Sequence, residues 1–141
     1  MSFELLDTKE TKANEGRSCI LLCNFDAKEV KTISNLAGML GIRDKVVLSY
    51  KNGNTLVKDV INGNILNDAE DGIRDKAVIF NNIPGGKIGL FINNLKKFRL
   101  NNILKAAVTE TSQEWTVNVL LKNLVAEKIA MQTGQEFDHE D

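Results

Sequence analysis

The sequence predicts an α/β domain built from two tandem copies of a βαβα unit, folded into a single compact pseudo-twofold domain. Short apolar runs, which are typical of strands covered on both faces, alternate with longer segments of helical periodicity. A segment rich in Asn, Asp and Gly divides the chain near its middle, as a linker does. The apolar pattern before this segment recurs after it, with an offset of 58 residues (77 − 19).

The first half begins with the apolar run Cys19–Cys23, which we expect to form a strand. Asp26, with Glu29 three residues later, predicts a helix that starts with a capping box, and Gly41 predicts its end. A second short strand is expected at residues 46–48, and a short helix from about Thr55. The inward faces of these two helices are expected to carry Val30, Ile33, Ala37, Leu40, Leu56, Val57, Val60 and Ile61.

The second half repeats this order with strands at residues 77–80 and 104–108. Pro84 is suited to the first turn of the intervening helix. Thr111 and Glu114 predict a capping box for the final helix, and Gly134 predicts its stop. The inward faces are expected to carry Ile88, Phe91, Leu95, Phe98, Trp115, Val119, Leu120, Leu124 and Ile129.

The match between the halves has two explanations, a duplication or the common periodicity of any two βα units. The offset of 58 places Leu21 on Ile79, and an offset of 60 (106 − 46) places Val46 on Ala106; this agreement in spacing favours duplication. Neither unit can bury both faces of its own strands, so we expect one four-stranded, mainly parallel sheet covered by helices. How the two strand pairs meet is left open. The predicted boundaries are a tail (1–16), a first repeat (17–62), an acidic linker (63–75), a second repeat (76–132) and an acidic tail (133–141).

Composition and charge limit the classes of protein to which this chain can belong. An apolar fraction of 43% and a charged fraction of 26% are ordinary for a globular protein. The formal net charge of −1 argues against a dedicated nucleic-acid binder. The start of the chain does not resemble a secretory signal, and no apolar run approaches the roughly 20 residues that span a bilayer. We therefore expect a bacterial-type cytoplasmic protein without membrane contact.

Cys19 and Cys23 are the two cysteines of the chain. In a strand they lie on one face about 13 Å apart, at about 3.3 Å per residue, which is too far for a disulfide. Two thiols alone make no zinc site. We expect buried, reduced core thiols and leave a redox or metal role as the alternative.

Nine residues are candidates for binding a polar ligand, because ligands of parallel α/β sheets bind beyond the carboxyl ends of the strands, where helix N-termini present free N–H groups. Three segments are expected to converge there, each with a structural alternative: a strand-end side-chain turn, a plain strand-to-helix turn, or helix capping and core packing. The full P-loop spacing is absent. We predict no catalytic residues, no metal site and no cofactor. The candidates are Asn24, Asn82, Gly85, Gly86, Lys87, Thr109, Glu110, Thr111 and Trp115.

The second half also carries a recognisable motif. It consists of Ala106, Ala107, Val108, Thr109, Glu110, Thr111 and Ser112, then Trp115 and Thr116, then Leu120, Leu121, Leu124 and Glu127. The motif resembles the C-terminal signature of an uncharacterised bacterial family, common in clostridia and their relatives and known only as a domain of unknown function (family 3783). The resemblance covers about residues 76–128 and implies no activity. The first half departs from it, with Ser49-Tyr50-Lys51 in place of Thr109-Glu110-Thr111 and no tryptophan.

One charge feature stands out between Lys76 and Thr109, where the chain has no Asp or Glu. A basic face of this kind contacts phosphate or an acidic partner, or else lies against the chain's own acidic linker. The basic residues are Lys76, Lys87, Lys96, Lys97, Arg99 and Lys105.

Three functions fit these patterns. The first is a non-enzymatic interaction or regulatory module with a protein partner or a second copy as its ligand. The second is a small polar-ligand or anion-binding protein that uses the strand carboxyl ends of the second repeat. The third, a nucleic-acid adaptor that uses the basic face, is the least favoured. Because only the second repeat keeps the motif and the basic face, we expect the function to lie there.

Overall fold

The computed structural model describes residues 16–140, and for residues 133–140 it describes the backbone alone. All but the last residue of the predicted N-terminal tail therefore lies outside the described range. Two short 3₁₀ turns, η1 and η2, accompany the helices and strands. The elements in chain order are β1 (Cys19–Cys23), α2 (Ala27–Met39), β2 (Lys45–Leu48), η1 (Tyr50–Asn52), α3 (Val57–Ile61), β3 (Ala77–Asn81), α4 (Gly85–Lys97), β4 (Leu104–Ala107), η2 (Ser112–Glu114) and α5 (Val117–Glu140).

The four strands form one open, mixed sheet in the order β2-β1-β3-β4. The pairs β1–β2 and β3–β4 are parallel, as helical crossovers require. The two central strands, β1 and β3, are antiparallel. The α/β class and the four-stranded sheet shared by both halves are therefore confirmed, and the central pair makes the sheet mixed.

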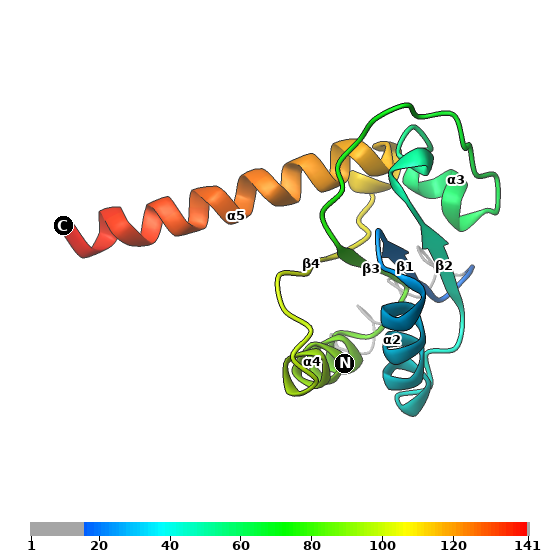
Figure 1. The fold of residues 1–141 in the computed structure, drawn as a ribbon, viewed down its shortest axis with the longest axis horizontal. Coiled ribbons are helices and arrows are strands. Elements are labelled where there is room, and N and C mark those ends of the chain that lie inside the picture. The colour runs from blue at the N-terminus through cyan, green and yellow to red at the C-terminus, as the bar shows by residue number, and fades with distance from the viewer. Residues whose placement is uncertain (1–15, 141) are drawn as a thin grey trace, which may run out of the picture.

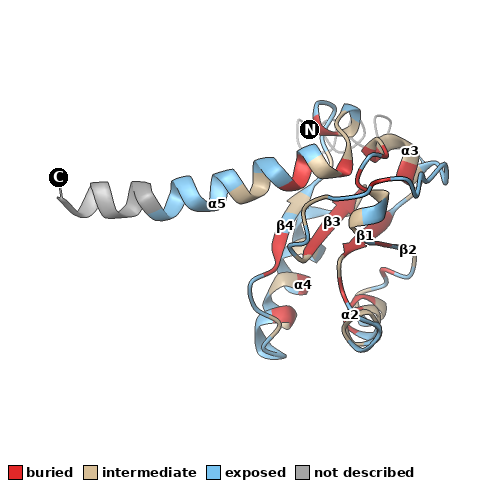
Figure 2. Cartoon of the chain, turned by 45° about the horizontal axis from the view of Figure 1, so that its top comes forward, coloured by how far each residue is buried: buried red, intermediate tan, exposed pale blue. Residues whose placement is uncertain are grey.

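Helices cover both faces of the sheet (Figures 1 and 2). Cys19, Leu21 and Cys23 of β1 face a core formed with α3 and α5, whereas Ile20 and Leu22 face a core formed with α2 and α4. All five residues of β1 are buried, as are all five of β3. Burial on both faces is the physical reason that these strands read as unbroken apolar runs.

The halves match in register as well as in order. Leu21 pairs with Val46 and Ile79 pairs with Ala106, so the offset changes from 58 to 60 between strands, as the sequence pattern does. Leu21 and Ile79 also pair with each other at the centre of the sheet. At one end of the sheet, Val57 N–H donates to Trp115 O (2.8 Å) and Val117 N–H donates to Thr55 O (2.9 Å), again related by 60. These contacts have the reciprocity of a twofold arrangement.

The predicted inward stripe of α4 is wrong at Phe98, whose side chain is 59% exposed. The helix ends at Lys97, and Arg99 then adopts a φ of 59°, which turns the chain. This turn brings Leu100 rather than Phe98 against the α2/α4 core. The capping box that begins α2 is confirmed, with Asp26 Oδ1 accepting from Glu29 N at 2.7 Å.

The predicted start of the last helix is also wrong. Thr111 makes no side-chain capping bond; instead Thr109 and Ser112 cap each other's backbone N–H groups, and α5 begins only at Val117. The face of α5 that packs on the core carries Val117, Leu120 and Leu121, and Val119 is 40% exposed. Ile129 is 57% exposed, so the predicted inward face does not extend to it. The helix also continues through Gly134, where a stop was predicted.

Cys19 and Cys23 are free, buried thiols on the same side of β1, which confirms the prediction. Burial raises the pKa of the Cys23 thiol to about 12 and raises that of Cys19 as well. Both thiols therefore stay protonated at neutral pH, and their place is in the packing of the α3/α5 core.

Candidate functional site

The nine predicted ligand residues do not converge on one edge of the sheet. Because β1 and β3 are antiparallel, Asn24 at the end of β1 and Asn82 at the end of β3 lie at opposite ends of the sheet. Asn82 and Thr109 follow the parallel neighbours β3 and β4 and do share an end. The expected convergence is therefore wrong for Asn24.

Asn24 and Asn82 hold the two halves together. Each adopts a left-handed backbone, with φ values of 67° and 57°, a conformation that asparagine tolerates better than most residues. The Asn24 side chain donates to Ile73 O (3.1 Å) and Asp75 O (2.9 Å), just before β3. The Asn82 side chain donates to Ser18 Oγ (2.9 Å), just before β1. Each asparagine therefore fastens the segment that leads into the central strand of the other half.

The glycine-containing turn that begins α4 lacks the arrangement of an anion cradle. Gly85 and Gly86 are exposed and have open space where a Cβ would lie, so nothing approaches them closely. The Lys87 ammonium reaches back towards the end of α2, 3.5 Å from the position of a Cβ on Gly41. At a helix C-terminus this charge meets favourable carbonyl dipoles, and it points away from the turn.

The Thr-x-Thr motif anchors the chain between β4 and α5. Thr109 and Ser112 bond reciprocally, their hydroxyl oxygens 3.1 Å apart, whereas Glu110 and Thr111 are exposed. Trp115 packs against the α3/α5 core, and its carbonyl accepts the Val57 N–H. The motif therefore supports the junction between the two halves.

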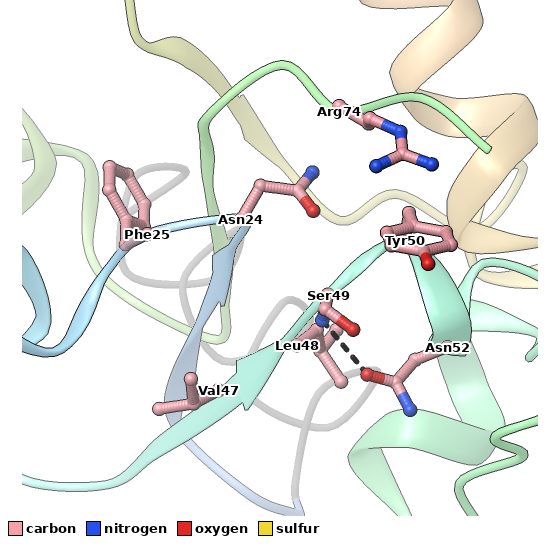
Figure 3. A pocket seen from close by; sticks show the side chains of 8 residues that line it. All are labelled: Asn24, Phe25, Val47, Leu48, Ser49, Tyr50, Asn52 and Arg74. Atoms are coloured by element: carbon pink, nitrogen blue, oxygen red, sulfur yellow. Dashed lines mark hydrogen bonds between the residues drawn. The ribbon is translucent and has the colours of Figure 1, made fainter. Parts of the chain in front are cut away.

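A pocket of about 440 Å³ lies at the carboxyl ends of β1 and β2, in the half that was expected to be scaffold (Figure 3). The Arg74 guanidinium lies over the Tyr50 ring, 3.9 Å from its centroid, in a cation–π contact. Asn52 closes one side by accepting the Ser49 N–H at 2.9 Å. The rule that ligands bind beyond strand carboxyl ends also applies to β2, so it could have identified Tyr50 from the sequence. Arg74 comes from the linker, and no sequence pattern indicated it. The lining residues are Asn24, Phe25, Val47, Leu48, Ser49, Tyr50, Asn52 and Arg74.

A groove of about 360 Å³ lies between β4 and α5, where α5 projects past the sheet (Figure 1). Its apolar side includes the buried Leu104 and the half-buried Leu124, and it ends at Met131, which is 67% exposed. Figure 2 shows that most of α5 between the sheet and residue 132 is exposed. The groove is lined by Ile103, Leu104, Lys105, Leu124, Glu127, Lys128, Met131 and Gln132.

The outer edge of β4 borders this groove. Leu104 N–H donates to Lys76 O and Val108 N–H donates to Phe80 O, both at 2.8 Å, so alternate residues of β4 bond to β3. The backbone groups of Lys105 and Ala107 therefore point away from the sheet. Within residues 16–140, no strand pairs with this edge.

Three lysines from three elements gather around the same edge. Partial burial, Lys96 of α4 and Lys128 of α5 together lower the pKa of Lys105 on β4. No ion pair involves any of the three lysines in the part of the chain that the structure describes. Their positive charges are therefore close together, and Glu127, which lines the same groove, forms no ion pair with them.

The basic residues of α4 do not lie against the acidic linker. The linker bonds to Lys51, Asn52 and Thr55 and to Asn118 of α5. It runs along the α3 side of the sheet, whereas α4 lies on the opposite side (Figure 1). The acidic linker therefore does not neutralise the basic residues of α4.

Residues 76–131 match the model of a family described as a domain of unknown function (DUF3783). The match spans β3, α4, β4, η2 and the first part of α5, and it includes most of the groove. It confirms the resemblance to an uncharacterised family that the motif around Trp115 predicted. No curated protein and no solved structure matches the chain.

Two properties concern the described residues only. None of their helices is long and apolar enough to cross a membrane. Nor do they contain three or more His, Cys, Asp or Glu side chains placed to hold a metal ion. The pocket beside Tyr50 and the groove beside β4 are the two larger hollows described above.

Proposed function

We propose that this domain is a non-enzymatic interaction module that binds another polypeptide along the outer edge of β4, beneath the projecting part of α5. The observation that carries this proposal is the free strand edge beside an apolar groove. A polypeptide that adds a strand to such an edge gains main-chain hydrogen bonds from the edge and side-chain contacts from the groove. Natural proteins often blunt a free edge with a short strand or a lysine, and β4 has four residues and carries Lys105. The apolar part of the groove beside this edge is what favours binding here.

The alternative of a small polar ligand at the strand carboxyl ends of the second repeat has weaker support. Lys87 reaches towards Gly41, and Thr109 bonds to Ser112. Thr109 therefore already has a structural partner, and the Lys87 ammonium lies near the end of α2. Strand addition, by contrast, uses the Lys105 and Ala107 backbone groups, which the described part of the chain leaves without a strand partner.

We also propose that the first half is a diverged copy of the unit that the family model describes. The shared registers and the reciprocal bonds around the Leu56–Thr116 bridge support this origin. The buried free thiols support a cytoplasmic location. In this proposal the first copy supplies half of the shared core, and the second copy adds the binding edge.

A library of random displayed peptides tests the proposed function directly. We expect selection on the native protein to enrich peptides whose binding Ala107→Pro abolishes. The proline removes an outward N–H and no bond of the ladder to β3, so the fold should survive. Val47→Pro is the matched control, because Val47 occupies the equivalent position on the other edge strand, β2 (107 − 60 = 47).

The readout is the affinity of each enriched peptide for the native protein and the two variants, with thermal unfolding as the check on folding. Peptides that bind the native protein and Val47→Pro alike, and lose binding to Ala107→Pro, support the module. Enriched peptides that bind Ala107→Pro as well as the native protein would overturn the proposal.

A further inference from the structure

We infer that the partner of the β4 edge is an acidic polypeptide strand in which apolar and carboxylate side chains alternate. This inference rests on the proposed function and adds the chemistry of its partner. It follows from the different surroundings that the two sides of the sheet offer beside β4.

The first step concerns the geometry of an added strand. Successive side chains of a strand point to opposite faces, so alternate side chains of the partner would meet different surfaces. β4 itself shows these two faces. Leu104 and Ala106 pair with Ala77 and Ile79 of the α3/α5 side, and Lys105 pairs with Val78 of the α2/α4 side.

On the α5 side the surface is mainly apolar. Leu104 of β4 and Leu124 and Met131 of α5 line the groove here. The polar residues Lys105, Glu127, Lys128 and Gln132 also line it. Met131 is largely exposed, so an apolar side chain placed here would remove it from water. The partner's residues on this side are therefore apolar.

On the α4 side the surface is basic. The register of β4 places Lys105 on this side, next to Val78. Lys105 senses the charge of Lys96 of α4 and also that of Lys128, which lies on α5 and lines the groove, and residues 77–109 contain no Asp or Glu. A carboxylate beside Lys105 would relieve the repulsion among the three ammonium groups and add a charge-assisted hydrogen bond. The partner's residues on this side are therefore Asp or Glu.

The same charges argue against a second copy of this chain as the occupant. A twofold pairing of β4 with another β4 would bring Lys105 and its neighbouring lysines towards an identical set. Like charges on paired strands are destabilising. An acidic partner removes this conflict.

Fluorescence anisotropy with a labelled eight-residue peptide of alternating Val and Glu provides the test. We expect the native protein to bind this peptide at least tenfold more tightly than a Val–Gln peptide, with a preference that weakens as salt is raised. Lys105→Gln should lower the affinity for the Val–Glu peptide at least threefold and leave the affinity for the Val–Gln peptide unchanged. Lys45→Gln, the equivalent change on β2, should alter neither affinity. Because Lys105 is exposed, Lys105→Gln should keep the native melting temperature, which checks that the variant is folded.

Four outcomes would overturn the inference. If the Val–Glu and Val–Gln peptides bind with equal affinity and Ala107→Pro still abolishes binding, the inference of an acidic partner is wrong and the proposed interaction module is retained. A dimer seen by sedimentation and abolished by Ala107→Pro would assign the edge to a second copy. Displacement of the peptide by a thymidine oligonucleotide that binds Ala107→Pro equally well would assign the lysines to nucleic acid. Binding of the Val–Glu peptide that Ala107→Pro leaves intact would defeat the inference and the proposed function together.

Discussion

The two halves of this domain share a core and differ at their ends. β1 and β3 are equally buried, and α2 and α4 have the same length of 13 residues. After the outer strand, however, the first half continues into α3 with five residues, and the second continues into α5 with 24 residues. The strands and helices that the two halves share are those that form the common core. The parts that differ hold the pocket beside Tyr50 and the groove beside β4.

The largest test of this comparison concerns the pair at the centre of the sheet. Leu21 and Ile79 are each fully buried and pair with each other. Leu21→Ala and Ile79→Ala should each lower the free energy of unfolding by about 2–5 kcal/mol, because both leave a cavity in the same core. Urea unfolding followed by circular dichroism measures both. Two separate transitions, or a large effect from one variant alone, would show that the halves do not share one cooperative core.

A smaller effect distinguishes the two asparagine contacts. Asn24 makes two bonds to the segment before β3, and Asn82 makes one to the segment before β1. Asn24→Ala should therefore cost about 2 kcal/mol, more than Asn82→Ala, from lost bonds and from left-handed strain. Glycine at either position removes the bonds and accepts the positive φ, so Asn→Gly should cost about 1 kcal/mol less than Asn→Ala. Equal costs for glycine and alanine would mean that the backbone conformation contributes nothing.

The smallest effect depends on pH and belongs to one half only. Cys23 and Asn81 are equivalent strand-end positions (23 + 58 = 81), and only the thiol titrates. The pKa of Cys23 rises from 9.0 to about 12 on folding, so its contribution to stability is complete below pH 9 and falls as the pH rises towards 12. We expect a loss on the order of 1 kcal/mol between pH 9 and pH 10. Urea unfolding of Cys23→Ala should show a shallower pH dependence, and an unchanged slope would contradict the assignment to this thiol.

Local patterns predicted most of the core because their causes are local. The run Cys19–Cys23 was identified as a buried strand from apolar content alone, and the Asp26–Glu29 box was identified from a spacing of three residues. The same reasoning failed at Thr111 and Glu114, where the spacing is right but the bonding is not. Glu114 pairs instead with Lys58 at 2.7 Å, a contact across 56 residues that no local pattern contains.

The candidate site was less predictable than the core. The rule for strand carboxyl ends named Asn24, Asn82 and Thr109 together, but it assumes that all strands point the same way. The groove residues lie on β4 and on a part of α5 about 20 residues later, and their proximity depends on where α5 crosses the sheet. Arg74 meets Tyr50 only because the linker passes over the end of β2.

By itself, the sequence determined the order and type of the elements, the buried faces of the central strands, and the free thiols on one side of β1. These depend on periodicity and apolar content within single segments. Only the tertiary structure decided that β1 and β3 run antiparallel, that α5 begins at Val117, and that it then leaves the sheet beside an open strand edge. The physical reason is that strand order and helix placement follow from burial of the whole core, which joins residues far apart in the chain.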